Sequence, residues 1–304
     1  MENSLFDGLE QAGFAGGRTL VIAMNGWNDA GEAASTAVTA LARQLELNRV
    51  VATFEGDDFY DYCTARPRIV RQDDGHRILE WPATKVHAAK HPQPNAAARV
   101  LPNANRLYLL TGAEPSMRWR QYASEVVEFC QREEIDRLVV VGALLADTPH
   151  TRDVPVVRTS EDESVQQEFD VESSQYEGPT GAMTAIVERA RQEGIVALSL
   201  WAQVPHYAAA PEASSPKAIL ALLNALAEVL LVEVDIDSFV EASSHWETQV
   251  TNAIAMDDEM TQYVKFLEQA RDTVDSEAAS GEAIAAEFER FLADESPRDE
   301  GEDR

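Results

Sequence analysis

The sequence has little cysteine and nothing that resembles a secretion signal. Only Cys63 and Cys130 occur among its 304 residues, so a disulfide framework is not expected and a reducing compartment is favoured. Cys130 lies on the apolar face of a predicted helix, which indicates a small buried hydrophobic residue. The first residues contain neither a basic stretch nor an apolar core, so we expect no secretion signal. These features predict a cytoplasmic protein.

Positive charge is also scarce. The chain has 25 Lys and Arg residues against 53 Asp and Glu residues, a formal net charge of -28 at pH 7. Such a field repels polyanions, so we expect no binding to nucleic acid or to an anionic membrane surface. The longest apolar stretch, residues 218–232, is interrupted by Asn224 and Glu228 and is too short to span a bilayer. High net charge is typical of a protein that stays soluble in a crowded cytosol.

Familiar catalytic motifs are missing as well. The sequence contains no G-x-S-x-G nucleophile elbow, no H-E-x-x-H motif, and neither of the common glycine-rich phosphate motifs. Cys63 has no histidine close to it in sequence that would act as a base and activate a thiolate. We therefore predict no cofactor and no metal, and the balance favours a protein that is not an enzyme.

The residues that are present predict a globular α/β protein. Hydrophobic residues make up 45% of the chain, enough for one large domain with an appendage. Apolar runs typical of covered strands alternate with helical periodicity, which predicts a three-layer α/β/α fold with a mostly parallel sheet. We expect strands at 18–24, 50–54, 106–110, 138–141, 154–158 and 195–201, helices at 34–45, 119–133, 180–192 and 216–232, and a hairpin over 69–81.

The strand pattern ends near Asp235. Residues 235–304 hold 20 acidic and 5 basic residues, so this segment supplies 15 of the 28 excess negative charges. Three stretches with helical periodicity follow, around 239–254, 260–267 and 284–292. We predict an α/β/α domain over 1–234, an acidic helical extension over 235–294 and a disordered tail over 295–304. A second acidic segment, 161–177, has no clear periodicity, which indicates a lid, an interaction loop or disorder.

Four loops combine unusual residues and each follows a predicted strand: 25–31, 111–120, 142–152 and 203–207. If the sheet is parallel, these loops meet at one edge, which we call the strand-end rim. The candidate rim pocket consists of Asn25, Trp27, Asp29, Glu114, Trp119, Arg120, Asp147, His150, Arg152, His206 and Tyr207.

The acidic and imidazole side chains of the strand-end rim have two interpretations. The first loop could cradle a phosphate before a helix, but a role for Asp29 in capping that helix is favoured. Asp147, His150 and His206 could bind a metal or act as acid and base. Histidines that hydrogen-bond within the protein are common, so a structural role is preferred for His150 and His206.

The cationic and aromatic side chains of the strand-end rim also have two interpretations each. Arg118, Arg120 and Arg152 could bind a carboxylate or phosphate, although pairing with Glu114, Asp147 and Asp29, which would lock the loops, is slightly favoured. Trp27, Trp119 and Tyr207 could stack on a ligand ring, but aromatic residues at the start of helices more often anchor packing.

Together these segments resemble the proteasome assembly chaperone 2 family, particularly its actinobacterial branch. The matching segments occur in order over residues 18–232: 26–31 (GWNDAG), 58–62 (DFYDY) with 66–67 (RP), 112–115 (GAEP) with 119–120 (WR), 142–143 (GA), 147–152 (DTPHTR), 176–181 (YEGPTG), 201–207 (WAQVPHY) and 215–218 (SPKA). The resemblance implies a fold similar to nucleoside phosphorylases, with a helical C-terminal region and no established reaction. Eukaryotic relatives are chaperones that assemble proteasome α-rings.

Two functions follow from the sequence. The first is a non-enzymatic assembly or interaction protein, expected to be homo-oligomeric, that contacts a protein partner through its strand-end rim and helical extension. The alternative is a small-molecule-binding protein or enzyme that acts on a nucleoside-like or anionic ligand at the strand-end rim. The link to phosphorylases is an analogy of fold only.

Overall fold

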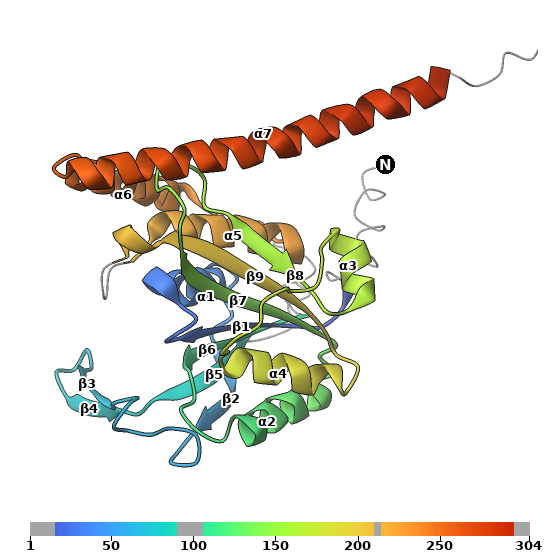
Figure 1. The fold of residues 1–304 in the computed structure, drawn as a ribbon. Coiled ribbons are helices and arrows are strands. Elements are labelled where there is room, and N and C mark those ends of the chain that lie inside the picture. Colours follow the sequence, from blue (N-terminus) through green and yellow to red (C-terminus); the bar gives the residue numbers. More distant parts are fainter. Residues whose placement is uncertain (1–15, 90–105, 210–213, 295–304) are drawn as a thin grey trace, which may run out of the picture.

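A seven-stranded sheet forms the centre of the molecule (Figure 1). The computed structural model describes residues 16–89, 106–209 and 214–294, with side chains of the last range described up to residue 276. The strand order is β2-β5-β6-β1-β7-β9-β8. Its strands are β1 (Thr19–Asn25), β2 (Arg49–Glu55), β5 (Ala83–Ala88), β6 (Leu107–Ala113), β7 (Arg137–Ala146), β8 (Val156–Thr159) and β9 (Val196–Pro205). A separate hairpin joins β3 (Arg68–Arg71) to β4 (Arg77–Glu80).

The middle of the sheet is parallel. β1 is buried from Thr19 to Met24, as expected for a strand covered on both faces. It pairs in parallel with β6 and β7, and β7 pairs in parallel with β9. β5 and β8 are antiparallel to β6 and β9, and β2 is antiparallel to β5. Five of the seven strands therefore run in the same direction, which confirms the predicted mostly parallel sheet.

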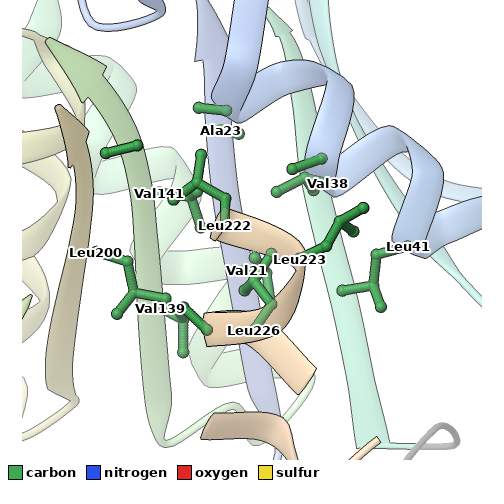
Figure 2. Close-up of a cluster of buried hydrophobic side chains, with 14 of the residues drawn as sticks. Val21, Ala23, Val38, Leu41, Val139, Val141, Leu200, Leu222, Leu223 and Leu226 are labelled. Atoms are coloured by element: carbon green, nitrogen blue, oxygen red, sulfur yellow. The ribbon is translucent and has the colours of Figure 1, made fainter. Parts of the chain in front are cut away.

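Helices cover both faces of the sheet. Alternate side chains of β1 enter two separate cores, because successive residues of a strand point to opposite faces. Val21 and Ala23 belong to one core, and Leu20 and Ile22 belong to the other. The helices are α1 (Ala33–Gln44) and α5 (Pro216–Leu230) over the first core, and α2 (Trp119–Arg132) and α4 (Ala182–Arg191) over the second. Figure 2 shows the first core, where leucines of α5 pack against valines of β1 and β7. The three layers confirm the predicted fold class.

Two further helices stack outside α5. α6 (Asp237–Ile254) lies on α5, and α7 (Asp258–Asp294) turns back along α6 and continues past the sheet (Figure 1). Trp246, Val264 and Leu267 are buried where these helices meet the body, with 9%, 5% and 5% of their surface exposed. A helical C-terminal region is thus confirmed. Within the described ranges, no helix has the length and apolar content needed to cross a bilayer.

Several details differ from the sequence predictions. β5 was not predicted, and the segment 161–177 contains a short helix, α3 (Glu163–Phe169), anchored by the buried side chain of Val165. The second and third predicted helical stretches of the extension form one continuous helix, α7. β7 and β9 extend beyond their predicted ends because residues 142–146 pair with residues 201–205. The predicted tail, 295–304, lies outside the described residues.

Two glycines of the sheet are required by close packing. A Cβ atom on Gly112 would lie 2.1 Å from the carbonyl oxygen of Ala83, and its φ of +137° is strained for other residues. Gly142 lies opposite Trp201 in the β7–β9 pairing, and a Cβ atom there would lie 2.3 Å from the indole ring. Both glycines fall in the ordered sequence segments described above, so part of that signature encodes the packing of neighbouring strands.

Candidate functional site

The loops of the strand-end rim follow the carboxyl ends of the parallel strands β1, β6, β7 and β9, whose last residues are Asn25, Ala113, Ala146 and Pro205. The loop after β1 is tied to β7 because the Ala143 amide donates to the carbonyl of Asn28 at 2.8 Å. The rim has two parts with different surroundings. The loops after β1 and β6 contact the starts of α1 and α4, and those after β7 and β9 contact α6 and α7.

Asp29 holds the start of α1. Its carboxylate accepts hydrogen bonds from the amides of Ala34 and Ser35 at 2.8 and 3.2 Å, and from the Ser35 hydroxyl at 2.5 Å. Asn25 donates its side-chain amide to the same hydroxyl at 3.0 Å. Burial raises the pKa of the Asp29 carboxyl, and the hydrogen bonds from Ser35 and Ala34 oppose that rise. The favoured capping interpretation therefore matches the geometry.

Glu114, the residue after β6, holds the start of α4 in the same way. Its Oε1 accepts the amide of Ala182, the first residue of α4, at 2.8 Å. Its own amide donates to the carbonyl of Asn25 at 3.1 Å. Gly181 leaves no room for a larger residue, since a Cβ atom there would lie 2.1 Å from Asn28 Nδ2 and 2.5 Å from Glu114 Oε1. Asn28, Glu114 and Gly181 thus join β1, β6 and α4 at one point.

The remaining residues of this part of the rim are more exposed. Trp27 has 63% of its surface exposed. Trp119 donates its indole N–H to the carbonyl of Pro115 at 2.6 Å, which anchors the start of α2. Arg118 pairs with Asp58 at 3.1 Å. Arg120 is exposed and forms no ion pair with any residue in the described ranges.

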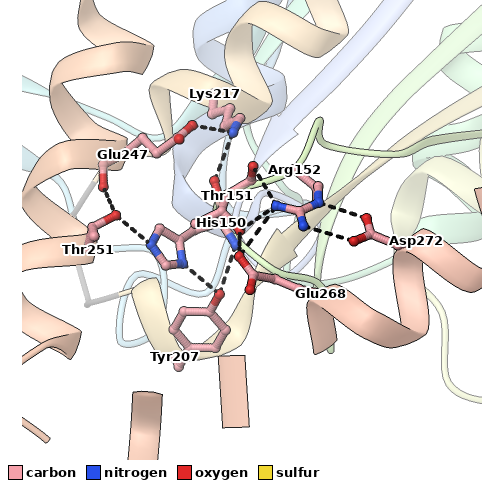
Figure 3. Close-up of polar contacts among 9 residues, drawn as sticks. All are labelled: His150, Thr151, Arg152, Tyr207, Lys217, Glu247, Thr251, Glu268 and Asp272. Carbon is pink, nitrogen blue, oxygen red and sulfur yellow. Dashed lines mark hydrogen bonds and ion pairs between the residues drawn. The ribbon is translucent and has the colours of Figure 1, made fainter. Parts of the chain in front are cut away.

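His150 lies at the centre of the other part of the rim, with 2% of its surface exposed. Its Nε2 is 3.0 Å from Thr251 Oγ1 on α6, and its Nδ1 is 3.0 Å from the Tyr207 hydroxyl (Figure 3). The Thr251 hydroxyl donates to the carbonyl of Glu247 at 2.8 Å, so Nε2 is the imidazole nitrogen that donates. Nδ1 then accepts from Tyr207, and the neutral ring satisfies both contacts.

The surroundings of His150 favour that neutral form. Burial lowers the pKa of its imidazole; Lys217 acts in the same direction, while Glu247 and Glu268 oppose it. Lys217 donates to the carbonyl of His150 at 2.8 Å and to the Glu247 carboxylate at 2.5 Å. Lys217 therefore links α5, the loop after β7 and α6.

Arg152 connects the same loop to α7. Its Nε and Nη2 donate to the two carboxylate oxygens of Asp272 at 2.8 and 2.9 Å, and Nη1 lies 3.4 Å from Glu268 (Figure 3). The Thr151 hydroxyl also donates to Glu268. The bidentate contact raises the pKa of Arg152 and lowers that of Asp272.

Asp147, His206 and Tyr207 complete the contact with α7. The Tyr263 hydroxyl donates to Asp147 Oδ1 at 3.0 Å, and His206 Nδ1 lies 3.2 Å from the same oxygen. The rings of His206 and Tyr207 meet that of Tyr263 edge to face, at centroid distances of 5.8 and 6.1 Å. Five of the predicted rim residues, Asp147 to Tyr207 in chain order, thus bind the C-terminal helices or the groups that hold them.

Sequence reasoning missed the partners of these residues. Lys217 was inside one of the ordered segments, but Glu247, Thr251, Glu268 and Asp272 belong to the acidic extension, where the sequence shows only charge and helical periodicity. Among the described residues, no group of three or more His, Cys, Asp or Glu side chains could hold a metal ion. Within the described residues, shallow depressions lie along α6 and on α7, and the one on α7 is lined in part by Asp272, the partner of Arg152.

Comparison with known proteins agrees with this architecture. The model of the PAC2 family matches residues 23–254. A PAC2 family protein from Streptomyces avermitilis is 37% identical with a TM-score of 0.69, covering 81% of this chain and 99% of its own. The Mycobacterium tuberculosis proteasome-assembly chaperone homologue is 36% identical with a TM-score of 0.68 and the same coverage, 81% and 99%.

More distant structures share the fold. Pyrococcus furiosus PbaB, an archaeal proteasome activator, is 15% identical with a TM-score of 0.59, covering 77% of this chain and 92% of its own. A search of curated proteins gave no significant match. The family match extends through the end of α6 and includes every segment of the strand-end rim. The chain therefore belongs to the PAC2 family.

Proposed function

We propose that this protein is a non-enzymatic, chaperone-like assembly factor that binds a protein partner in the cytoplasm. The proposal rests on one observation: the polar residues of the strand-end rim bind other parts of the same chain. Asp29 and Glu114 hold helix starts, and His150 and Arg152 hold α6 and α7. Side chains committed to such contacts are not available to a substrate without breaking them.

Apolar side chains remain exposed at the same edge. Leu144 and Leu145 at the end of β7 have 40% and 54% of their surface exposed, and Val157 on β8 has 40%. Val157 on β8 pairs with Trp201 on β9, and Trp201 pairs with Gly142 on β7. Leu144 follows Gly142 by two residues on the same strand. Leu144 and Val157 therefore lie on one face of the sheet, and Leu145, the next residue of β7, lies on the opposite face. Grouped exposed apolar residues are typical of surfaces that bind other proteins.

The relatives support a class of partner to test first. The Mycobacterium tuberculosis protein, 36% identical over 81% of this chain, is described as a homologue of proteasome-assembly chaperones. Proteasome α-subunits are therefore the first partner to test, and other subunits of assembling complexes are the next. The acidic surface of this chain favours a partner with a basic contact face.

The test is capture from extract of the source cells by the full-length tagged protein. We expect reproducible recovery of a small set of proteins, retained by Met256→Glu and lost with Leu144→Glu. Met256 is a matched control because it is also apolar and exposed, at 90%, but lies between α6 and α7. Repeated failure of the wild-type protein to recover any specific protein would overturn the proposal.

The alternative, a small-molecule-binding protein or enzyme, predicts a different result. A nucleoside, inorganic phosphate or another anion that binds the strand-end rim would raise the melting temperature with increasing concentration. Arg120→Gln would reduce that shift, because Arg120 is exposed and forms no ion pair with the described residues. A concentration-dependent shift that Arg120→Gln abolishes would favour the alternative over the assembly factor.

A further inference from the structure

The β3–β4 hairpin presents an apolar and basic face to solvent. Ile69 is paired directly with Leu79, and Arg71 with Arg77, so these four side chains share one face of the two-stranded sheet. Ile69 and Leu79 have 60% and 49% of their surface exposed. Among the described residues, these two strands alone form this sheet. An isolated two-stranded hairpin is marginally stable in water, so this face gains from a covering surface.

The charges on the hairpin indicate which surface would cover it. Like charges directly opposite each other destabilise an antiparallel pair, and Arg71 lies opposite Arg77. Neither arginine forms an ion pair with a residue in the described ranges; Arg71 donates only to the carbonyl of Gly75, at 3.3 Å. A complementary surface therefore combines an apolar residue with carboxylates that lie roughly 7 Å from it, the distance between residues i and i+2 of a strand.

α6 carries such a surface. A shallow depression along this helix is lined by Asp237, Val240, Glu241, Ser244, His245 and Thr248. Val240 has 47% of its surface exposed. Asp237 and Glu241 are four residues apart and thus lie on one face of the helix, about one turn, roughly 5–6 Å, apart. Neither carboxylate forms an ion pair within the described part of the chain.

The two surfaces cannot meet within one molecule. Figure 1 shows the β3–β4 hairpin and α6 on opposite sides, with α5 and the central sheet between them. α6 packs on α5, and α5 packs on the sheet. The region from Asp237 to residue 276 holds nine acidic and two basic residues, which surround the depression with negative charge. The basic hairpin face and the acidic helix face are therefore complementary between copies.

We propose that the protein associates with itself head to tail, with the Ile69, Leu79, Arg71 and Arg77 face of the hairpin docked on the Asp237, Val240 and Glu241 face of α6 in a second copy. The two aliphatic side chains cover Val240, and the two guanidinium groups pair with the two carboxylates. Different patches on each copy form this contact, so it repeats from copy to copy. It closes into a ring or continues as a filament, according to the rotation between copies.

The contact does not depend on the proposed function. Its partner is this chain itself, whereas the assembly-factor proposal concerns the apolar surface around Leu144 and Val157. Loss of self-association with capture of a partner intact, or the reverse, would separate the two.

The test uses sedimentation velocity on the purified full-length protein over a range of protein and salt concentrations. We expect wild-type species heavier than the 33.5 kDa monomer that dissociate as salt increases. The hairpin variant Arg71→Gln/Arg77→Gln and the helix variant Asp237→Asn/Glu241→Gln should each associate at least about tenfold more weakly. Arg43→Gln/Arg132→Gln makes the same change in charge elsewhere and should associate like the wild type.

Mixing the two variants is the decisive step. One variant keeps an intact α6 face and the other keeps an intact hairpin, so an equimolar mixture should form a 1:1 dimer that grows no further. All exchanged side chains are exposed, and unchanged melting temperatures will show that the variants fold. A monomeric wild-type protein, association unaffected by both variants, or a mixture that remains monomeric would each overturn the proposal.

Discussion

Asp29 offers a direct test of whether the strand-end rim holds helices or awaits a ligand. Asp29→Ala removes a carboxylate that accepts three hydrogen bonds, from the amides of Ala34 and Ser35 and from the Ser35 hydroxyl. Ala34 has 0% of its surface exposed and Ser35 has 7%, so water cannot readily replace the lost acceptor. Two amides at the start of α1 are left without their partner.

The expected cost follows from these contacts. Losing a side chain that caps a helix costs about 0.5–2 kcal/mol, and each buried donor left unpaired costs about 1–3 kcal/mol. The two ranges describe the same lost contacts and are not added. Because burial raises the pKa of the Asp29 carboxyl, the charged group also has a desolvation cost that reduces the net gain. We expect a loss of about 2–4 kcal/mol for Asp29→Ala and about 1 kcal/mol for Asp29→Asn, which keeps an acceptor oxygen.

Urea denaturation and calorimetry at pH 7 measure these differences. Each kcal/mol lowers the melting temperature by about 2–4 °C in a domain of this size class. Hydrogen exchange should localise the effect, with faster exchange in the first turn of α1. If Asp29→Ala costs less than Asp29→Asn, or if neither variant loses stability, Asp29 does not hold the start of α1 as described.

Three further predictions concern the contacts of the rim and sheet. Burial lowers the pKa of His150, so the unfolded chain binds more protons at this residue than the folded chain does. The free energy of unfolding should therefore fall as pH drops below about 6.5 and through the lower pKa of the folded state. Melting temperatures from pH 8 to 5 should show this fall, and His150→Gln should flatten it. Lys217→Met removes donors to the His150 carbonyl and to α6, so it should cost about 1–2 kcal/mol and speed hydrogen exchange in α6; unchanged exchange there would contradict the linking role. Gly112→Ala should lower stability by about 3 kcal/mol, whereas Gly56→Ala, which has a positive φ but no atom within 4 Å of the added Cβ, should cost less in the same urea series.

The central elements could be predicted because local pattern and final environment agree. β1 is a nearly continuous apolar run, and its residues from Thr19 to Met24 are buried. α1 and α5 show apolar residues at helical spacing and bury those same residues. β5 escaped prediction because only alternate residues of Ala83–Ala88 are buried and a hairpin precedes it. α3 has a single buried residue, too little for a periodic signal.

The residues of the candidate site could be predicted, but most of their contacts could not. Capping of α1 by Asp29 is local, six residues or fewer along the chain, and the sequence indicates it. His150 and Thr251 are 101 residues apart, and Asp147 and Tyr263 are 116 apart. Such pairs depend on how α6 and α7 pack against the body, which local periodicity does not encode.

The late position of these partners in the chain has a consequence for synthesis. On the ribosome the segments that form the sheet emerge before α6 and α7, so His150, Arg152 and Lys217 are made well before Thr251, Asp272 and Glu247. Until then the loops after β7 and β9 present uncovered polar and aromatic groups. A nascent chain therefore passes through a stage in which these loops lack their partners, and translation of its last quarter supplies the helices that cover them.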